Sequence, residues 1–219
     1  MVTNKVVVRE GGRPRSFEND DVFLATAAVL SRLGYSRLSL DAVAQEIAVS
    51  GPAISRRFGS KHGLLRDYLA WSIETAQQRF CTVRTLHASP LAALCARYLM
   101  PFDERPEELS AFTGWLDMRC DDDLAPLLRA RKTMWEEEAA SLLAAAREAG
   151  ELTDCDTAAL ARSMTAALAG ATLLWFPDDE PLLHRYAEIL ETLLRPYRTD
   201  SLPANPAVLA TPSGNNTRQ

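Results

Sequence analysis

The sequence lacks the short motifs of the common enzyme and metal-site classes. It has no G-x-S-x-G, no glycine-rich phosphate loop and no H-E-x-x-H. Its three histidines show no metal-ligand spacing, and its four cysteines (Cys81, Cys95, Cys120 and Cys155) form no C-x-x-C pair. We therefore expect no catalytic residue, no bound metal and no cofactor. Buried free thiols in a reducing compartment are expected, with a cysteine redox switch as the alternative.

Strand signals and membrane-spanning runs are also scarce. The run of valines at residues 6–8 is too isolated to form a sheet. The apolar run at residues 154–176 is near the minimum length for a membrane span and is interrupted by Arg162 and Ser163, and no signal peptide precedes it. Helical periodicity covers the rest of the chain, which predicts an all-α protein of about nine helices without a membrane segment.

Residues 39–58 contain two short amphipathic segments separated by a turn. The first begins at Ser39, whose hydroxyl can cap a helix, and its apolar residues share one face: Leu40, Val43, Ala44 and Ile47. Ser50 is the predicted cap of the second helix, and Pro52 falls in its first turn. An apolar stripe over residues 20–33 stops at Gly34, so this part of the chain predicts three helices.

The second segment has an exposed face suited to reading DNA. Because Ile54 and Phe58 point inward together, a rotation of about 100° per residue places the opposite face at Pro52, Ala53 and Arg56, with Ser55 and Arg57 on its flanks. Small residues let the start of a helix approach base edges, while longer cations reach bases or phosphates. After it, Ser60 is the predicted cap of the next helix, where Lys61 suits a phosphate. The pattern predicts a helix-turn-helix.

Residues 17–66 resemble the N-terminal domain of TetR-type (tetracycline-repressor-like) bacterial transcriptional regulators. The most specific parts are Gly34-Tyr35, the run LDAVAQEIAVS and the junction Phe58-Gly59-Ser60-Lys61. The resemblance implies an all-helical homodimer whose N-terminal domains bind DNA and whose larger C-terminal domains dimerise and usually bind a small effector. The DNA-binding residues expected from the pattern and the resemblance together are Ser39, Ser50, Gly51, Pro52, Ala53, Ser55, Arg56, Arg57 and Lys61.

Two positions depart from the family pattern. Ser55 stands where the family usually has a tyrosine that touches the DNA backbone, and Gly51 stands where Lys or Arg is frequent. Both departures remove contacts to DNA, which Arg56 and Arg57 can offset. They motivate an alternative function: a helical dimer with a degraded recognition helix that binds a protein partner or sequesters a ligand.

The charge is distributed unevenly along the chain. The whole chain carries a net charge of −5, but residues 1–66 hold ten Lys and Arg against six Asp and Glu. We call residues 1–66 the head and residues 67–219 the body. A basic head on an acidic body orients the protein toward DNA and makes its association with DNA salt-dependent. We divide the chain into a flexible basic arm (1–16), a DNA-binding domain (17–66), an effector-binding and dimerisation domain (67–198) and a disordered tail (199–219). The arm follows phosphates or enters the minor groove, or is simply a basic tail.

The C-terminal part of the chain predicts six further helices. Their ranges are 60–86, a segment from Pro90, a segment from Pro106, 124–149, 154–176 and 179–197. The fifth of these is apolar around much of its circumference, so a second subunit must cover part of it. The residues expected at this dimer interface are Ala158, Ala161, Ala169, Leu182, Ile189 and Leu193.

Bulky and polarizable side chains gather in the middle of this domain. The candidates for an effector pocket are Tyr98, Phe102, Trp115, Met118 and Met134. Ordinary core packing uses the same residue types. Arg97, Arg119 and Asp117 are either polar contacts of a ligand or surface charges. We expect a small effector that is more hydrophobic than charged.

These patterns favour one function over others. We expect a cytoplasmic, nucleoid-associated homodimer that binds a double-stranded, pseudo-palindromic operator and is released by an unidentified effector, most simply as a repressor. Enzymatic activity has no support among the motifs.

Overall fold

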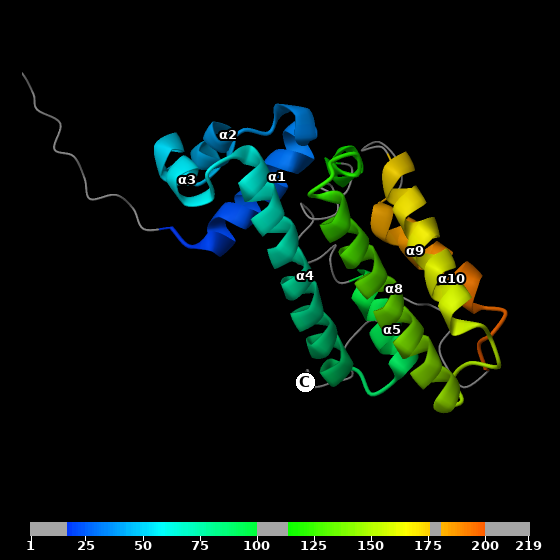
Figure 1. Ribbon diagram of the computed structural model, residues 1–219. Helices are drawn as coiled ribbons and strands as arrows, with labels where there is room; N and C mark the ends of the chain where they lie inside the picture. Colours follow the sequence, from blue (N-terminus) through cyan, green and yellow to red (C-terminus); the bar gives the residue numbers. More distant parts are fainter. Residues whose placement is uncertain (1–16, 100–113, 176–180, 200–219) are drawn as a thin grey trace, which may run out of the picture.

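The computed structural model describes residues 17–99, 114–175 and 181–199, and these residues are helical with short connections (Figure 1). A short helical segment covers residues 114–118. The eight labelled helices are α1 (Asn19–Arg37), α2 (Leu40–Glu46), α3 (Gly51–Phe58), α4 (Lys61–Leu86), α5 (Pro90–Leu99), α8 (Ala125–Glu148), α9 (Thr157–Leu174) and α10 (Leu182–Leu194). The all-α prediction is confirmed. The predicted arm, Phe102, residues 106–113 and the tail from residue 200 lie outside the described residues.

The helix boundaries follow the predicted caps, with one exception. Ser39 Oγ accepts a hydrogen bond from the Ala42 N–H at 3.1 Å, and Ser60 Oγ accepts one from the Gly63 N–H at 3.0 Å. Gly34 has φ 75°, the left-handed conformation expected where the first helix breaks. The predicted side-chain cap at Ser50 is wrong, because only its backbone carbonyl accepts from Ala53 N, at 2.9 Å.

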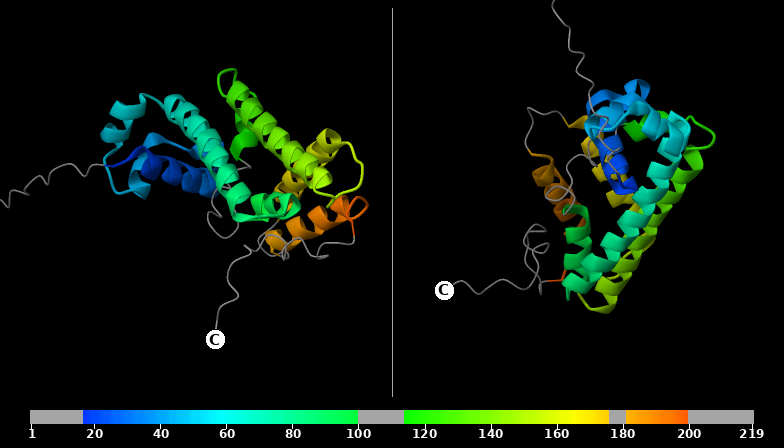
Figure 2. Two further views of the ribbon diagram at one scale, coloured as in Figure 1. Left: turned by 90° about the horizontal axis from the view of Figure 1, so that it is seen from below. Right: turned by 90° about the vertical axis from the view of Figure 1, so that its left-hand side faces the viewer.

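Two apolar cores lie at the two ends of α4. The first core joins α1, α2, α3 and the start of α4, and the second joins the end of α4 to α5, α8, α9 and α10. Figure 2 shows α4 running without a break from one group of helices to the other. The predicted boundary at residues 66–67 therefore falls inside a continuous helix. The first core also includes Trp115, Met118 and Leu124 from the middle of the chain.

Helix α9 buries one face within the protomer and leaves another exposed. Its buried residues are Leu160, Ala161, Met164, Leu168 and Thr172, whereas Leu173 and Leu174 are 50% and 73% exposed. In the described part of the chain, α9 is the one helix long and apolar enough to cross a membrane, and it packs against α8 and α10.

The six residues expected at the dimer interface divide into two groups. Ala161 and Leu182 lie in the protomer's own core, so they offer almost no surface to a partner. Ala158 is exposed, and Ala169, Ile189 and Leu193 are half-buried. The cysteines also differ from expectation, since Cys81 and Cys120 are exposed while only Cys95 is fully buried.

Candidate nucleic-acid interface and ligand cavity

Helix α3 presents one polar face to solvent and anchors the other in the first core. Ile54 and Phe58 are buried as their spacing predicts, and the Phe58 ring lies 5.8 Å from that of Phe23 between centroids. The predicted recognition face is exposed at Pro52, Ser55, Arg56 and Arg57 and half-buried at Gly51 and Ala53. A helix held this way can enter a major groove with its polar face leading.

The cations around α3 are held in different ways. Arg57 Nη1 donates to the Phe17 carbonyl at 2.7 Å, and its guanidinium lies 5.0 Å from the Phe17 ring centroid. Lys61 Nζ donates to the Tyr35 carbonyl and lies 4.2 Å from the Tyr35 ring centroid, while burial lowers its pKa. Arg56 is exposed and has no hydrogen bond or ion pair to any described residue. It is therefore the cation on α3 that a ligand can engage without displacing a protein contact.

Close approaches to a glycine occur at both ends of α3. A Cβ added at Gly51 would lie 1.8 Å from Asp41 Oδ1, so the Asp41 side chain occupies the space that a longer residue at position 51 needs. A Cβ added at Gly63 would lie 2.2 Å from the Phe58 carbonyl oxygen, which fixes the start of α4 against the end of α3. Neither approach was predicted, because each joins residues whose spacing follows no helical or strand period.

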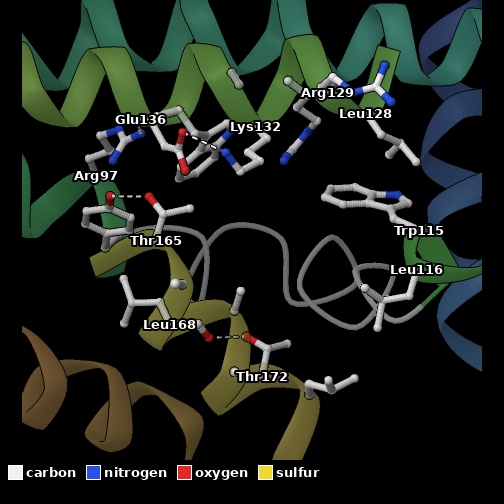
Figure 3. A pocket seen from close by; sticks show the side chains of 18 of the residues that line it. Arg97, Trp115, Leu116, Leu128, Arg129, Lys132, Glu136, Thr165, Leu168 and Thr172 are labelled. Carbon is white, nitrogen blue, oxygen red and sulfur yellow. Dashed lines mark hydrogen bonds and ion pairs between the residues drawn. The ribbon is translucent and has the colours of Figure 1, made fainter. Parts of the chain in front are cut away.

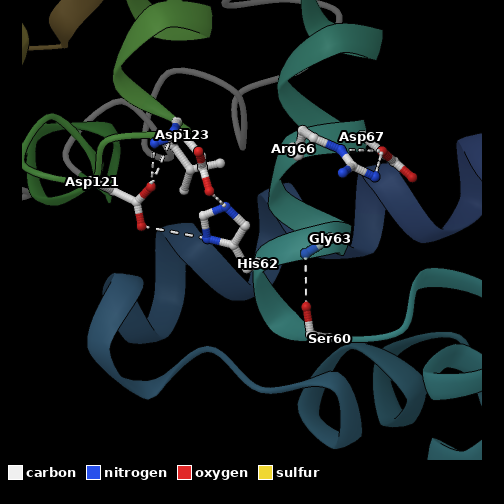
Figure 4. Close-up of polar contacts among 8 residues, drawn as sticks. Ser60, His62, Gly63, Arg66, Asp67, Asp121 and Asp123 are labelled. Carbon is white, nitrogen blue, oxygen red and sulfur yellow. Dashed lines mark hydrogen bonds and ion pairs between the residues drawn. The ribbon is translucent and has the colours of Figure 1, made fainter.

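A polar contact joins the start of α4 to the start of α8 (Figure 4). His62 Nδ1 lies 3.4 Å from Asp121 Oδ2, and His62 Nε2 lies 3.3 Å from Asp123 Oδ2. The other Asp121 oxygen accepts from the N–H groups of Asp123 and Leu124, both at 3.0 Å. Asp121 thus holds the turn that precedes α8. The two carboxylates face opposite nitrogens of one ring, so the contacts are ion pairs only when His62 carries both ring protons.

A cavity of about 610 Å³ lies between α4, α5, α8, α9 and α10. Its apolar wall includes the rings of Phe80, Tyr98, Trp115 and Trp135. The predictions for Tyr98 and Trp115 agree with this lining. Met118 and Met134 do not line the cavity: Met118 is fully buried in the first core, and Met134 lies off the face of α8 that the cavity uses.

The charged lining that the described residues supply to the cavity is cationic. Among these residues, six cations contribute to it, against one carboxylate, Glu136, which pairs with Lys132 at 2.8 Å. The six are Arg79, Arg97, Arg119, Arg129, Arg131 and Lys132. Figure 3 shows Arg97 and Thr165 toward one end, Trp115 at the other, and Arg129 and Lys132 on the α8 side between them. Arg97 and Arg119 therefore lie where a ligand can meet them, whereas Asp117 is exposed outside the lining.

Trp115 belongs to both the cavity and the first core. It is 7% exposed, lines the cavity and packs in the cluster that contains α1 and the start of α4. Beside it, a Cβ at Gly114 would lie 3.2 Å from Leu30 Cδ2 of α1, so this segment fits closely against the helix-turn-helix domain. The guanidinium of Arg131 lies 4.0 Å from the Trp115 ring centroid on the cavity side. A ligand that moves Trp115 in the cavity would therefore also change the packing of the first core in the helix-turn-helix domain.

A family model described as bacterial regulatory proteins, tetR family, matches residues 23–68. These residues contain most of α1, all of α2 and α3, and the first residues of α4. No curated protein has a sequence that matches this chain at a significant level.

Solved structures share the fold over most of the chain. A putative transcriptional regulator from Saccharomonospora viridis, in complex with choline, is 18% identical with a TM-score of 0.71, and the match covers 83% of this chain and 97% of that one. A TetR-family regulator from Agrobacterium tumefaciens is 16% identical with the same TM-score and coverages. SmeT, the repressor of the Stenotrophomonas maltophilia multidrug efflux pump SmeDEF, is 19% identical with a TM-score of 0.64, over 84% of this chain and 92% of that one. Residues 23–68 thus match the TetR family of bacterial regulatory proteins, and the described residues share the fold of solved TetR-family regulators.

Proposed function

We propose that the protein is a dimeric, ligand-responsive repressor that binds a pseudo-palindromic operator. The observation that carries this proposal is α3, which is anchored by Ile54 and Phe58 and exposes Arg56 without a partner among the described residues. Arginine is the residue that most often reads a guanine edge in the major groove. The basic head, with ten cations against six acids over residues 1–66, supports approach to a polyanion.

The dimer of the proposal uses the exposed face of α9 together with α10. Leu173 and Leu174 leave apolar surface uncovered in the protomer, and the small residue Ala158 permits close approach of a second helix. A two-fold dimer places one α3 in each half-site, and the half-site centres lie about 34–36 Å apart or slightly more on one face of the duplex.

Ligand binding would reach DNA through Trp115 and α4. The cavity and the first core share Trp115, and α4 carries cavity residues Ala76 and Phe80 on the same helix that begins at the α3 junction. A ligand that favours one position of these elements biases the equilibrium between DNA-competent and DNA-incompetent states. In this scheme the effector acts as an inducer in the cytoplasm.

The apolar wall and the cationic side chains of the cavity determine which effectors can bind there. Its volume of about 610 Å³ falls in the range of small-molecule sites. The S. viridis neighbour was solved with choline, which is a cation. The six cationic side chains that the described residues place in this cavity disfavour a ligand of that charge here.

The test is footprinting of the purified protein on DNA upstream of its own and adjacent genes, with unrelated DNA as competitor, at low and moderate salt. Two symmetric protected half-sites that survive competitor are the expected result. Uniform protection that disappears with salt would contradict operator recognition and favour the alternative of a helical dimer with a degraded recognition helix.

A further inference from the structure

Arg97 is a buried cation whose hydrogen-bonding capacity is incompletely used. The side chain projects from α5, is 3% exposed and lines the cavity. Its Nη2 donates to the backbone carbonyl of Trp135, whereas Nε and Nη1 have no hydrogen-bond partner among the described residues. Arginine stays protonated in proteins, so these nitrogens are buried donors on a positive charge. Such groups are costly unless an acceptor completes them.

The acids near Arg97 are engaged elsewhere. Glu138 pairs with Arg84, and Glu136 pairs with Lys132. No ion pair joins Arg97 to a described residue. Burial lowers the pKa of Arg97, and the neighbouring Tyr98 and Glu138 offset only part of that effect. Within the described part of the chain, the positive charge of Arg97 therefore has no carboxylate partner of its own.

Aromatic rings hold the guanidinium in place. Its Cζ lies 4.5 Å from the ring centroid of Phe80, 4.5 Å from that of Tyr98 and 4.4 Å from that of Trp135. These contacts favour a cation and restrict its movement. A group fixed by three rings and one hydrogen bond is preorganised, so an anion that meets it loses little binding free energy to ordering the side chain.

The remainder of the cavity fits an apolar body attached to that anion. Leu128, Leu168 and Trp115 extend the lining away from Arg97, and Arg129 and Lys132 keep the electrostatic potential positive along the α8 side (Figure 3). A carboxylate at Arg97 would also lie near the hydroxyls of Tyr98 and Thr165, which are 3.4 Å apart. The lining thus matches one anionic end and one apolar end.

We propose that the effector is an amphipathic organic anion, of the class of aromatic or aliphatic carboxylates, whose charged group binds Arg97 and whose body lies toward Trp115. This inference rests on the proposed function for its regulatory meaning, and it replaces the expectation of a predominantly hydrophobic effector. Charge-assisted hydrogen bonds to a desolvated guanidinium are the strongest interaction that the cavity offers.

The test compares two fluorescent probes with the same rings, 8-anilinonaphthalene-1-sulfonate and the uncharged N-phenyl-1-naphthylamine. We expect the wild-type protein to bind the sulfonate at least tenfold more tightly. Arg97→Met should remove at least tenfold of the sulfonate affinity and leave the neutral probe within threefold, because methionine can occupy the space between the rings without charge. Biphenyl-4-carboxylate should displace the sulfonate more strongly than biphenyl-4-carboxamide does.

Arg147→Met is the matched control, because Arg147 lies on the exposed end of α8, pairs with Asp154 and does not line the cavity. It should leave both probes unchanged. Arg97→Lys, which keeps the charge, should retain part of the sulfonate affinity. Equal binding of both probes by the wild type would overturn the proposal, and so would equal weakening of both by Arg97→Met. If Arg97→Met does not fold, the proposal is still tested by the two probes on the wild-type protein and by the sulfonate affinity of Arg97→Lys.

The same proteins are tested separately for footprints on upstream DNA. A footprint without preference for anionic probes would reject the ligand class and leave the regulator intact. Anion preference without a footprint would support the Arg97 site and reject operator binding. The two proposals therefore fail independently.

Discussion

The head and the body each place arginine at a proposed binding site, but they hold it in opposite surroundings. Arg56 on α3 is exposed to water, whereas Arg97 on α5 is buried among three aromatic rings. An exposed cation is hydrated when unbound, so binding DNA there depends on the release of counterions and on direct contacts. A buried cation has already lost its hydration, so an anion that reaches it meets an unsatisfied donor.

This difference shows that the net charge of a region does not predict the charge inside its binding site. The body is acidic overall, since the whole chain carries −5 and the head carries an excess of cations. The described residues nevertheless place six cations and one acid in the lining of the cavity. Acids such as Asp117, Glu137 and Glu148 lie at exposed positions instead. Counting charges along the chain correctly identifies the head as basic, because its charged residues are solvated. The same count gives the wrong sign for the charge inside the cavity of the body.

The largest expected effect is that of Trp115→Ala, which removes a side chain shared by both regions. Truncation of a buried tryptophan costs about 3–5 kcal/mol of folding stability. We expect a lower thermal midpoint together with weaker probe binding and weaker operator binding. Met134→Ala is the control, since Met134 is half-buried and outside the cavity lining. Loss of probe binding with an unaltered thermal midpoint would mean that Trp115 does not support the first core.

The next largest effect is expected at the exposed arginine. If Arg56 reads a base, Arg56→Ala should cost about 1–3 kcal/mol at the operator and relax preference at one base position. Competition binding with operator variants measures both. Arg37→Ala is the control, because Arg37 is an exposed arginine of α1 whose Nε donates to the Leu33 carbonyl. An operator preference that survives Arg56→Ala would exclude this residue from base readout.

A smaller effect is expected at Lys61, whose ammonium is held by the Tyr35 carbonyl. If Lys61 contacts a phosphate, Lys61→Ala should weaken binding to all DNA sequences and reduce the salt slope by about one. Titrations at several salt concentrations give the slope. An unchanged slope with a lower thermal midpoint would assign Lys61 to holding α1 against α4.

The smallest effect concerns pH. His87 is buried, and burial lowers its pKa from 6.5. A histidine with a lower pKa in the folded state takes up its proton more readily when unfolded, so its contribution to stability is present above about pH 6.5 and is lost as pH falls below that value. His87→Gln should flatten the fall in thermal midpoint between pH 7 and pH 5. A fall of the same steepness in this variant would assign the acid sensitivity to other groups.

The parts of the molecule predicted well are those governed by local rules. The caps at Ser39 and Ser60, the break at Gly34 and the inward spacing of Ile54 and Phe58 depend on residues within one or two helical turns. The cavity was predicted only in part, since Tyr98 and Trp115 line it but Met118 does not. Trp115 and Met118 are both large and apolar, so their residue types do not show which of them lines the cavity. That difference follows only from the way residues 114–124 pack against α1.

The parts that local rules missed involve contacts between distant segments. Asp41 fills the space beside Gly51, and Arg97 meets Phe80 and Trp135 from two other helices. In the sequence Arg97 stands between an alanine and a tyrosine on an apolar helix, and nothing there indicates whether it reaches solvent or a cavity. Its surroundings follow from tertiary packing, which residue spacing within one helix does not specify.

The double position of Trp115 has a consequence for how such a regulator can diverge. Residues such as Arg129 touch the cavity from an exposed part of α8, so inherited substitutions there can alter ligand preference while the head keeps its packing. A substitution at Trp115 changes the cavity and the first core together. Descendants of this protein that acquire a new effector should therefore vary first along α8 and retain an aromatic residue at position 115.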